Sequence, residues 1–335
     1  LFRSGFAWIK RELTPAIEDK IMQLGIPGLA FVTESKRFYP GGSEASHILG
    51  AVNIDNQGIA GIEKAMDNDD VALLQQVGLA RGNELAPVNL SIDLRVQHVM
   101  HDVLVDAVAR YRADDASGVI MDIKTGEILG LVSLPDFDPN DPVTALQKDS
   151  FNRITAGIYE LGSTMKSVTI AGALDSGKVK INDRMDARFG VRFGRFTIDD
   201  FHGQHRMLTV PEVYQYSSNI GAIRVMQQWG KENFRAFLHK VHFDEKEPLE
   251  LPESRAPIVA KTFSDIVAAT AAFGHGLSVS PMAMLRAMGA FANGGVMVRP
   301  TLYKTTADKA AATYEQVISP ETSREMRYIM RLNAT

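Results

Sequence analysis

The sequence predicts an α+β fold in two modules, with residues 1–86 as an elongated N-terminal module and residues 87–335 as a larger domain. The length of 335 residues suits two domains of ordinary size. Two strand-like runs follow one another closely along the sequence near the start of the second module, and helical patterns dominate after them. A composition that is 45% hydrophobic and 23% charged is typical of a globular protein.

The first module is expected to be partly extended. Residues 7–24 form a charged, helix-like stretch and residues 61–66 a second, shorter one, with glycine and proline between them, as at Gly25 and Pro40. The chain begins at Leu1 rather than at methionine, so we expect a signal or anchor segment to precede it in the natural protein.

A long helix is expected at the start of the second module. Residues 88–92 alternate in polarity like a strand, and Asp93 is the expected cap of the helix that follows. Helical spacing predicts a common apolar face for Val96, Val99, Leu104, Val105 and Val108.

A β-hairpin follows, because residues 116–123 and 127–134 are rich in β-formers and are joined by Lys124-Thr125-Gly126, the composition of a tight turn. The remainder is mostly helical. Caps, glycines and prolines delimit the expected helices at residues 162–176, 210–216, 220–229, 263–273, 281–292 and 320–332.

Composition excludes several classes of protein. The net charge of −4 is too balanced for a protein that holds nucleic acid by bulk electrostatics. No apolar run approaches the ~18–20 residues that cross a bilayer. The absence of cysteine excludes disulfides, thiolate metal sites and a cysteine nucleophile, and leaves the compartment undetermined.

Ser163 and Lys166 are the most informative pair of residues. They stand at the start of a predicted helix, where residues three apart share a face, so the amine can reach the hydroxyl. A serine becomes a nucleophile only beside a base, and an ammonium becomes a base only where burial or a nearby cation depresses its pKa. The alternative is a capping serine with a surface lysine.

Ser217 and Asn219 form a second candidate pair, in the turn between two predicted helices. Both side chains can point into one cleft, where the Ser217 hydroxyl would relay a proton and the Asn219 amide would hold a substrate amide. Thr209 and Glu212 have the spacing of a capping box for the first of these helices. A second helix cap is the alternative for this pair.

Together these motifs resemble the penicillin-binding proteins of class B, whose transpeptidase domain carries Ser-x-x-Lys, Ser-x-Asn and Lys-Thr-Gly. The resemblance covers nearly the whole chain. Further segments similar to the family are residues 91–97 and 119–140, Asn152-Arg153, the Gly-rich residues 273–281, and short stretches within residues 25–63 that look like its membrane-proximal pedestal, a dimerisation-like module. The resemblance implies a serine β-lactamase/transpeptidase-like domain, an antiparallel sheet flanked by helices, with only its first strands present here.

Three departures from the family pattern stand out. The usual Glu-Pro-Gly before the serine is Glu160-Leu161-Gly162, and the proline that often follows the lysine is Ser167. No Lys-Thr-Gly follows Asn219, and the one at Lys124 to Gly126 precedes the nucleophile and is interpreted as a hairpin turn. In relatives the motif lies beyond the last predicted helix, so we expect the chain to be truncated before it and the natural polypeptide to continue past Thr335.

The resemblance implies a D-alanyl-D-alanine transpeptidase that cross-links peptidoglycan stem peptides through a serine acyl-enzyme. Ser163 would attack the D-Ala-D-Ala carbonyl, Lys166 would take its proton, and Ser217 would pass a proton to the leaving D-Ala, while backbone N–H groups, one from Ser163, would hold the oxyanion. β-Lactams would acylate the same serine. Asn219 is the asparagine at the third position of Ser-x-Asn. Asparagine there is typical of division-type, penicillin-binding protein 3-like enzymes, because elongation-type relatives usually carry aspartate at this position.

The resemblance also implies partners and a location. The expected partners are the stem pentapeptide, β-lactam antibiotics, a membrane glycosyltransferase and divisome proteins, with no nucleic acid and no cofactor. The expected location is the periplasmic face of the bacterial inner membrane, anchored by an N-terminal helix outside this chain. One alternative is a β-lactamase or β-lactam sensor, but no deacylating base stands out in the sequence. The other is a non-catalytic divisome scaffold, which the missing Lys-Thr-Gly motif favours.

Other polar patterns favour no metal site. His98 and His101, like His202 and His205, have a spacing that allows metal binding, but no third ligand is evident. Residues 136–140 begin like a calcium loop and then lack the glycine and glutamate that such a loop needs.

Overall fold

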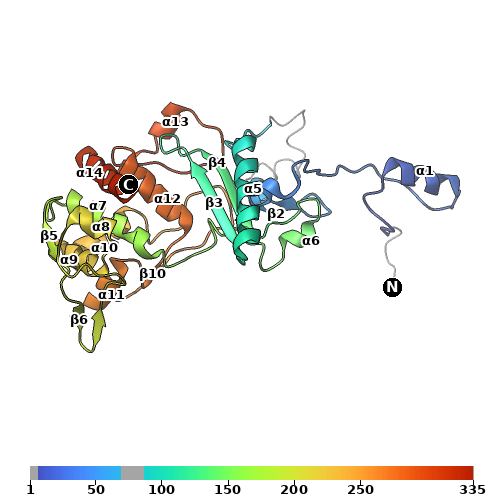
Figure 1. Ribbon diagram of the computed structural model, residues 1–335. Coiled ribbons are helices and arrows are strands. Elements are labelled where there is room, and N and C mark those ends of the chain that lie inside the picture. Colours follow the sequence, from blue (N-terminus) through green and yellow to red (C-terminus); the bar gives the residue numbers. More distant parts are fainter. Residues whose placement is uncertain (1–6, 69–86, 335) are drawn as a thin grey trace.

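The computed structural model describes residues 7–68 and 87–334, and these form an α+β fold. Figure 1 shows most helices gathered on one side of the β3–β4 hairpin, with α5 on its other side and an N-terminal arm reaching away from the body. The helices are α1 (Pro15–Gln23), α2 (Ser46–Leu49), α3 (Gly61–Asn68), α5 (Leu94–Tyr111), α6 (Pro142–Ala145), α7 (Met165–Asp175), α8 (Val210–Gln215), α9 (Asn219–Trp229), α10 (Lys231–Lys240), α11 (Asp265–Ala271), α12 (Pro281–Ala292), α13 (Ala307–Ala311) and α14 (Pro320–Asn333), with 3-10 turns η1 (Gly42–Ala45) and η2 (Gly162–Thr164).

The strands of the described residues pair two by two and antiparallel. The pairs are β1 (Ala51–Val52) with β2 (Gly58–Ala60), β3 (Ala116–Met121) with β4 (Ile128–Leu134), β5 (Arg184–Asp186) with β8 (Met207–Thr209), β6 (Val191–Phe193) with β7 (Phe196–Ile198), β9 (Ile258–Val259) with β10 (Leu277–Ser278), and β11 (Val296–Met297) with β12 (Glu315–Gln316).

The β3–β4 hairpin and α5 form the layer next to the helical region. The predicted hairpin is confirmed: pairing runs from Ala116 opposite Leu134 to Ile120 opposite Gly130, and the register shifts before Met121 pairs with Ile128. Glycines on both strands let the helix lie close, because a Cβ on Gly118 would meet Met100 at 3.2 Å and one on Gly130 would meet the same side chain at 3.0 Å.

The predicted apolar face of α5 is partly wrong. Asp93 caps the helix as expected, through its side chain and the Arg95 N–H. Val99 and Val105, however, are 61% and 42% exposed. The side chains that contact the hairpin glycines are Val96, Met100 and Leu104, which are spaced four residues apart. The predicted face included Val96 and Leu104 but missed Met100.

The N-terminal arm is less helical than predicted. Only Pro15–Gln23 is helical within residues 7–24, because Thr14 is extended with φ −75° and ψ 151° and Pro15 occupies the first helical position. Arg11 holds the arm together by pairing with Glu34 at 2.7 Å and with Asp55.

Other boundary predictions have mixed outcomes. The short helix expected at residues 61–66 is confirmed by α3. Residues 88–92 do not form a regular strand, since only a single bridge joins Leu90 to Tyr303. The module boundary predicted near residue 86 lies outside the described residues. Within residues 7–68 and 87–334, no helix is both long and apolar enough to cross a membrane.

Helix α7 is the centre of the main hydrophobic core. Every residue from Met165 to Leu174 is buried, so this helix has no solvent-facing stripe. Close packing starts at Gly172, where an added Cβ would lie 2.3 Å from the Trp229 ring and 2.6 Å from Phe237. Because burial already begins at Met165, the first turn of α7 is also enclosed, which fixes the direction of its side chains.

Candidate active site

The first site element is the turn that leads into α7. Gly162 has φ +56°, which favours glycine, and the chain then forms the short η2 turn before the helix. This geometry leaves Ser163 exposed at the tip, while Lys166, one turn further on, is only 1% exposed. A reachable hydroxyl therefore stands directly above a buried amine.

The second site element is the turn between α8 and α9. The predicted capping box of Thr209 and Glu212 starts α8 and is confirmed. Ser217 follows α8 with φ +53°, a left-handed conformation that a serine adopts only under constraint. Ser218 then caps α9, accepting the Gly221 N–H at 2.8 Å.

The four residues predicted from the sequence lie together around one nitrogen. Lys166 Nζ lies 3.0 Å from Ser163 Oγ and 2.9 Å from Ser217 Oγ. It also lies 2.8 Å from Asn219 Oδ1 and 2.7 Å from the Ser217 carbonyl oxygen. The Ser217 hydroxyl in turn donates to Ser163 Oγ at 2.8 Å, which closes a triangle between two hydroxyls and the amine.

Burial lowers the pKa of Lys166 to about 8, against an opposing effect of the Asp200 carboxylate. An ammonium has three protons for four oxygen neighbours. The neutral amine donates two hydrogen bonds and accepts one, which lets the Ser163 hydroxyl point its proton at Nζ. The arrangement can therefore activate a hydroxyl for attack on a carbonyl.

Asp200 is a site residue that the sequence patterns missed. Its carboxylate accepts the Ser218 hydroxyl at 2.6 Å and the Ile220 N–H at 2.9 Å, on both sides of Asn219. The preceding carbonyl, that of Asp199, accepts the Asn219 amide at 3.4 Å. No motif marked Asp200, because a single aspartate among many has no spacing that distinguishes it.

The Gly-rich segment at residues 273–281 contacts the turn that bears Ser163, in keeping with the resemblance. The Gly162 N–H donates to the Gly274 carbonyl at 3.3 Å. Glu160 accepts the Gly276 N–H at 2.7 Å and lies 3.0 Å from the His275 ring. These two contacts lower the pKa of Glu160, and the hydrogen bond from the Gly276 backbone has the larger effect.

Lys124-Thr125-Gly126 lies in the turn of the β3–β4 hairpin, as interpreted from the sequence. The Gly126 N–H donates to Asp122 at 2.8 Å and the Gly126 carbonyl accepts the Thr301 N–H at 2.9 Å. The Tyr314 hydroxyl donates to the Lys124 carbonyl. These partners belong to the turn and to the C-terminal loops rather than to the α7 cluster.

His98, His101 and the acidic loop noted in the sequence each have a partner of their own. His98 pairs with Glu44 at 2.8 Å, and His101 pairs with Asp136 at 2.9 Å. Asn140 binds both backbone groups of Tyr39, which ties residues 136–140 to the segment before α2.

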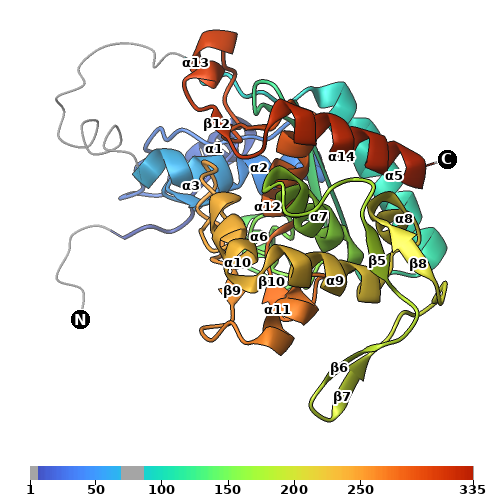
Figure 2. The ribbon, with the colours of Figure 1, turned by 90° about the vertical axis from the view of Figure 1, so that its left-hand side faces the viewer.

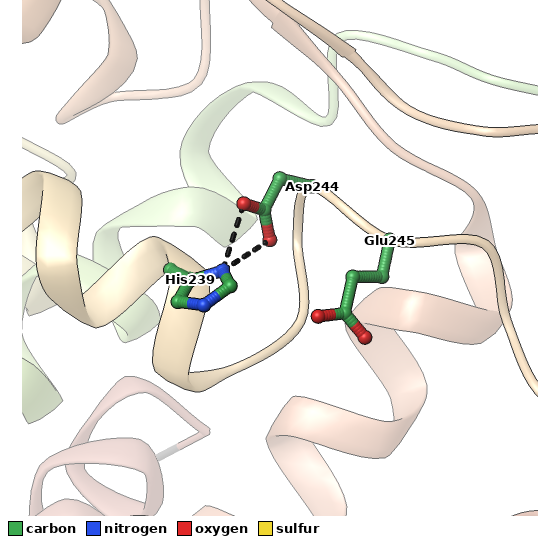
Figure 3. A group of neighbouring side chains, drawn as sticks. All are labelled: His239, Asp244 and Glu245. Carbon is green, nitrogen blue, oxygen red and sulfur yellow. Dashed lines mark hydrogen bonds and ion pairs between the residues drawn. The ribbon is translucent and has the colours of Figure 1, made fainter.

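Among the described residues, another group has the ligand types for a metal ion: His239, Asp244 and Glu245, shown in Figure 3. The His239 ring lies 2.8 Å and 3.1 Å from the two Asp244 oxygens. Glu245 pairs with His242 at 3.0 Å. All three side chains are exposed and satisfy one another or a neighbour, so the group is explained as a surface ion-pair cluster.

Comparison with known proteins gives the same family as the motifs. A family model described as the penicillin binding protein transpeptidase domain matches residues 116–335. The chain belongs to this family. The family resemblance inferred from the sequence is therefore confirmed.

Two curated relatives show how far the likeness extends. The chain is 36% identical over 327 residues to a probable peptidoglycan D,D-transpeptidase FtsI of Caulobacter vibrioides, covering 98% of this chain and 54% of the relative. It is 31% identical over 344 residues to a probable peptidoglycan D,D-transpeptidase PenA of Neisseria meningitidis, covering 97% and 58%. The chain thus spans little more than half the length of these relatives.

Solved structures of relatives share the fold. The apo transpeptidase domain of Burkholderia pseudomallei penicillin-binding protein 3 aligns with a TM-score of 0.65 at 29% identity, covering 76% of this chain and 72% of that one. A putative peptidoglycan glycosyltransferase from Atopobium parvulum aligns with a TM-score of 0.74 at 24% identity, covering 90% and 72%, which extends the likeness of fold. The predicted fold class is confirmed.

Proposed function

We propose that the chain carries the reactive centre of a serine peptidoglycan D,D-transpeptidase. The observation that carries the proposal is the Lys166 amine, buried, lowered in pKa to about 8 and 3.0 Å from the Ser163 hydroxyl. An exposed nucleophile over a buried base is what acyl transfer from a carbonyl requires. The names of the curated relatives, probable peptidoglycan D,D-transpeptidases, support the same activity.

Acylation begins with attack of Ser163 Oγ on the carbonyl between the two terminal D-alanines of a stem peptide. The serine proton moves to the neutral Lys166 amine as the carbon–oxygen bond forms. Backbone N–H groups, including that of Ser163, stabilise the oxyanion of the tetrahedral intermediate. The C–N bond to the terminal D-alanine then breaks, and an acyl-enzyme ester remains on Ser163.

Ser217 and Asn219 complete the step in this proposal. The Ser217 hydroxyl lies within 2.9 Å of both Lys166 Nζ and Ser163 Oγ, so it is the group that passes a proton from Nζ to the departing amine. Asn219 orients the amine through Oδ1 and offers its amide to the substrate backbone. The amine of a second stem peptide then attacks the ester, and Ser163 regains its proton.

The hydrogen bonds of the centre support a transferase over a hydrolase. A β-lactamase needs a base positioned to activate water at the ester, and no acidic residue stands out for that role in the sequence. The nearby carboxylates are occupied: Glu160 binds His275 and Gly276, and Asp200 binds the start of α9. The complete network around Lys166 also favours catalysis over a purely scaffolding role.

The same proposal extends to the cellular role and the location of the enzyme. Asn219, together with the FtsI name of relatives in Caulobacter vibrioides and Escherichia coli, supports a part in septal wall synthesis. Such an enzyme works at the periplasmic face of the inner membrane, beside a membrane glycosyltransferase and other divisome proteins. In this proposal residues 87–335 belong to the transpeptidase domain and residues 1–86 to its supporting module.

The test is covalent labelling by a fluorescent penicillin, followed by intact mass measurement. Ser163→Ala should lose the label and keep its melting temperature, because an exposed hydroxyl contributes little to packing. Thr164→Ala, one residue along the same turn, is the matched control and should label normally. Undiminished labelling of the Ser163 variant would overturn the assignment. A slow release of the label separates a transpeptidase from a β-lactamase.

A further inference from the structure

The β6–β7 hairpin is the most prominent projection near the reactive centre. Figures 1 and 2 show it extending beyond the helical body in both views. Its two strands pair only with each other, with Val191 opposite Ile198 and Phe193 opposite Phe196. Val191 is buried in the main core, and Phe193 and Ile198 pack against that core, so one side of the hairpin is anchored while the rest projects.

The surface of this hairpin is aromatic and cationic. Phe189 is 75% exposed, Phe196 is 55% exposed, and Phe201, just beyond β7, is 92% exposed. Arg195 stacks over the Phe196 ring at 5.1 Å, and Arg192 donates to the Gly194 carbonyl. Neither arginine forms an ion pair with any residue that the structure describes. The segment from Phe189 to Ile198 contains no acidic residue.

The base of the hairpin is joined directly to the reactive centre. The Asp199 carbonyl, one residue after β7 ends, accepts the Asn219 amide, and Asp200 holds the start of α9. The hairpin therefore projects from a base that is fixed beside Asn219, so a long ligand that reaches the site can also run along the hairpin. This continuity distinguishes the hairpin from the apolar surface of α5, where nothing in the structure shows what covers it.

We propose that the β6–β7 hairpin binds the peptidoglycan strand whose stem peptide reacts at Ser163, with Arg192 and Arg195 pairing with stem-peptide carboxylates and Phe196 packing on sugar faces. This rests on the proposed function. Guanidinium groups that have no carboxylate partner match carboxylates in geometry and charge, and exposed aromatic rings offer flat apolar surfaces. A strand of amino sugars with carboxylate-bearing peptides presents both chemistries at once.

The experiment compares polymeric and small ligands with the full natural protein. The variant Arg192→Glu/Arg195→Glu reverses the hairpin charge, and Arg192→Lys/Arg195→Lys retains it. The matched control is Lys178→Glu/Lys180→Glu, which makes the same charge change at two exposed residues of another loop. Each protein is tested for binding to purified uncross-linked glycan strands with pentapeptide stems and for acylation by a fluorescent penicillin.

We expect the glutamate variant to bind strands about tenfold more weakly at low salt, with penicillin acylation unchanged within twofold. The lysine variant keeps the charge but not the planar fork, so it should bind more tightly than the glutamate variant and more weakly than wild type, and the loop control should behave as wild type. Unchanged strand binding, or an equal loss in the loop control, would overturn the proposal. So would a parallel loss of penicillin acylation, which indicates a disturbed site. A wild-type protein that penicillin fails to acylate contradicts the proposed function instead, so the two failures are distinguishable.

Discussion

Helices α7 and α5 are both long, apolar in pattern and predicted from the sequence, yet they are packed in opposite ways. Helix α7 is buried from Met165 to Leu174 without a solvent-facing stripe. In α5 Gln97 is the buried residue, while Leu94, Val99 and Val103 are at least 60% exposed. The difference shows what each helix does. Enclosure of α7 removes water from the Lys166 amine and so lowers its pKa, whereas α5 only supports the hairpin and needs a single packed face.

The largest effect is expected at the enclosed helix, from Lys166→Arg. The variant keeps the positive charge but loses the base, because guanidinium does not deprotonate in proteins. Penicillin acylation should fall by about 10²–10⁴-fold, the usual contribution of general base catalysis. The second-order acylation rate measures this, with Lys178→Arg as an exposed control. A rate near that of wild type would leave Lys166 an electrostatic role alone.

The acylation rate should depend on pH through the same amine. Only the neutral amine accepts the serine proton, so the rate should rise as pH passes about 8 and then level off. The folded-state pKa lies below the unfolded value of 10.5, so the unfolded chain binds more protons between these values. This group's contribution to stability therefore rises with pH across that window. A rate that is flat from pH 6 to 9 would contradict the lowered pKa.

A large structural effect is expected from Gly172→Val in α7. A Cβ there meets Trp229 at 2.3 Å, so the added side chain forces the core apart. The free energy of unfolding should fall by about 1–3 kcal/mol, as for overpacked cores. Denaturant titration of the variant beside wild type measures the change. An unchanged midpoint would show that α7 tolerates movement.

An intermediate effect is expected from Asp200→Asn, which removes a charge that binds the start of α9 and raises the pKa of Lys166. Acylation should fall about tenfold, for the loss of ~1.5 kcal/mol of charged hydrogen bonding. The midpoint of the pH profile should move down. Asp199→Asn is the neighbouring control and should have little effect. A drop in rate with no pH shift would mean that Asp200 acts through geometry alone.

The smallest effect is expected on α5, from Val99→Ser. This side chain is 61% exposed, so its removal exposes little new apolar surface. The free energy of unfolding should change by less than about 0.5 kcal/mol, and acylation should remain at the wild-type rate. A fall of more than about 1 kcal/mol in the free energy of unfolding would show that Val99 is more enclosed than its exposed fraction indicates.

Local rules predicted much of the fold and of the candidate site. The spacing of Ser163 and Lys166 on one helical face predicted their contact, because residues three apart lie on the same side of a helix. That this pair meets Ser217 and Asn219, more than fifty residues further along the chain, was expected from the family resemblance and not from local spacing. Asp200 was not predicted, since its hydrogen bonds depend on how two distant segments meet. Likewise, the contacting face of α5 depends on where Gly118 and Gly130 allow close approach.

The backbone contact between Gly162 and Gly274 has a consequence for how this protein can change under antibiotic selection. An added Cβ on Gly274 would lie 2.0 Å from the Gly162 carbonyl oxygen, and Gly274 has φ +96°, so any substitution displaces the turn that carries Ser163. In the proposed transpeptidase, such a change would harm the reaction with the stem peptide and the reaction with a β-lactam together. Alleles with reduced drug sensitivity are therefore expected at side-chain positions around this contact, and not at Gly274.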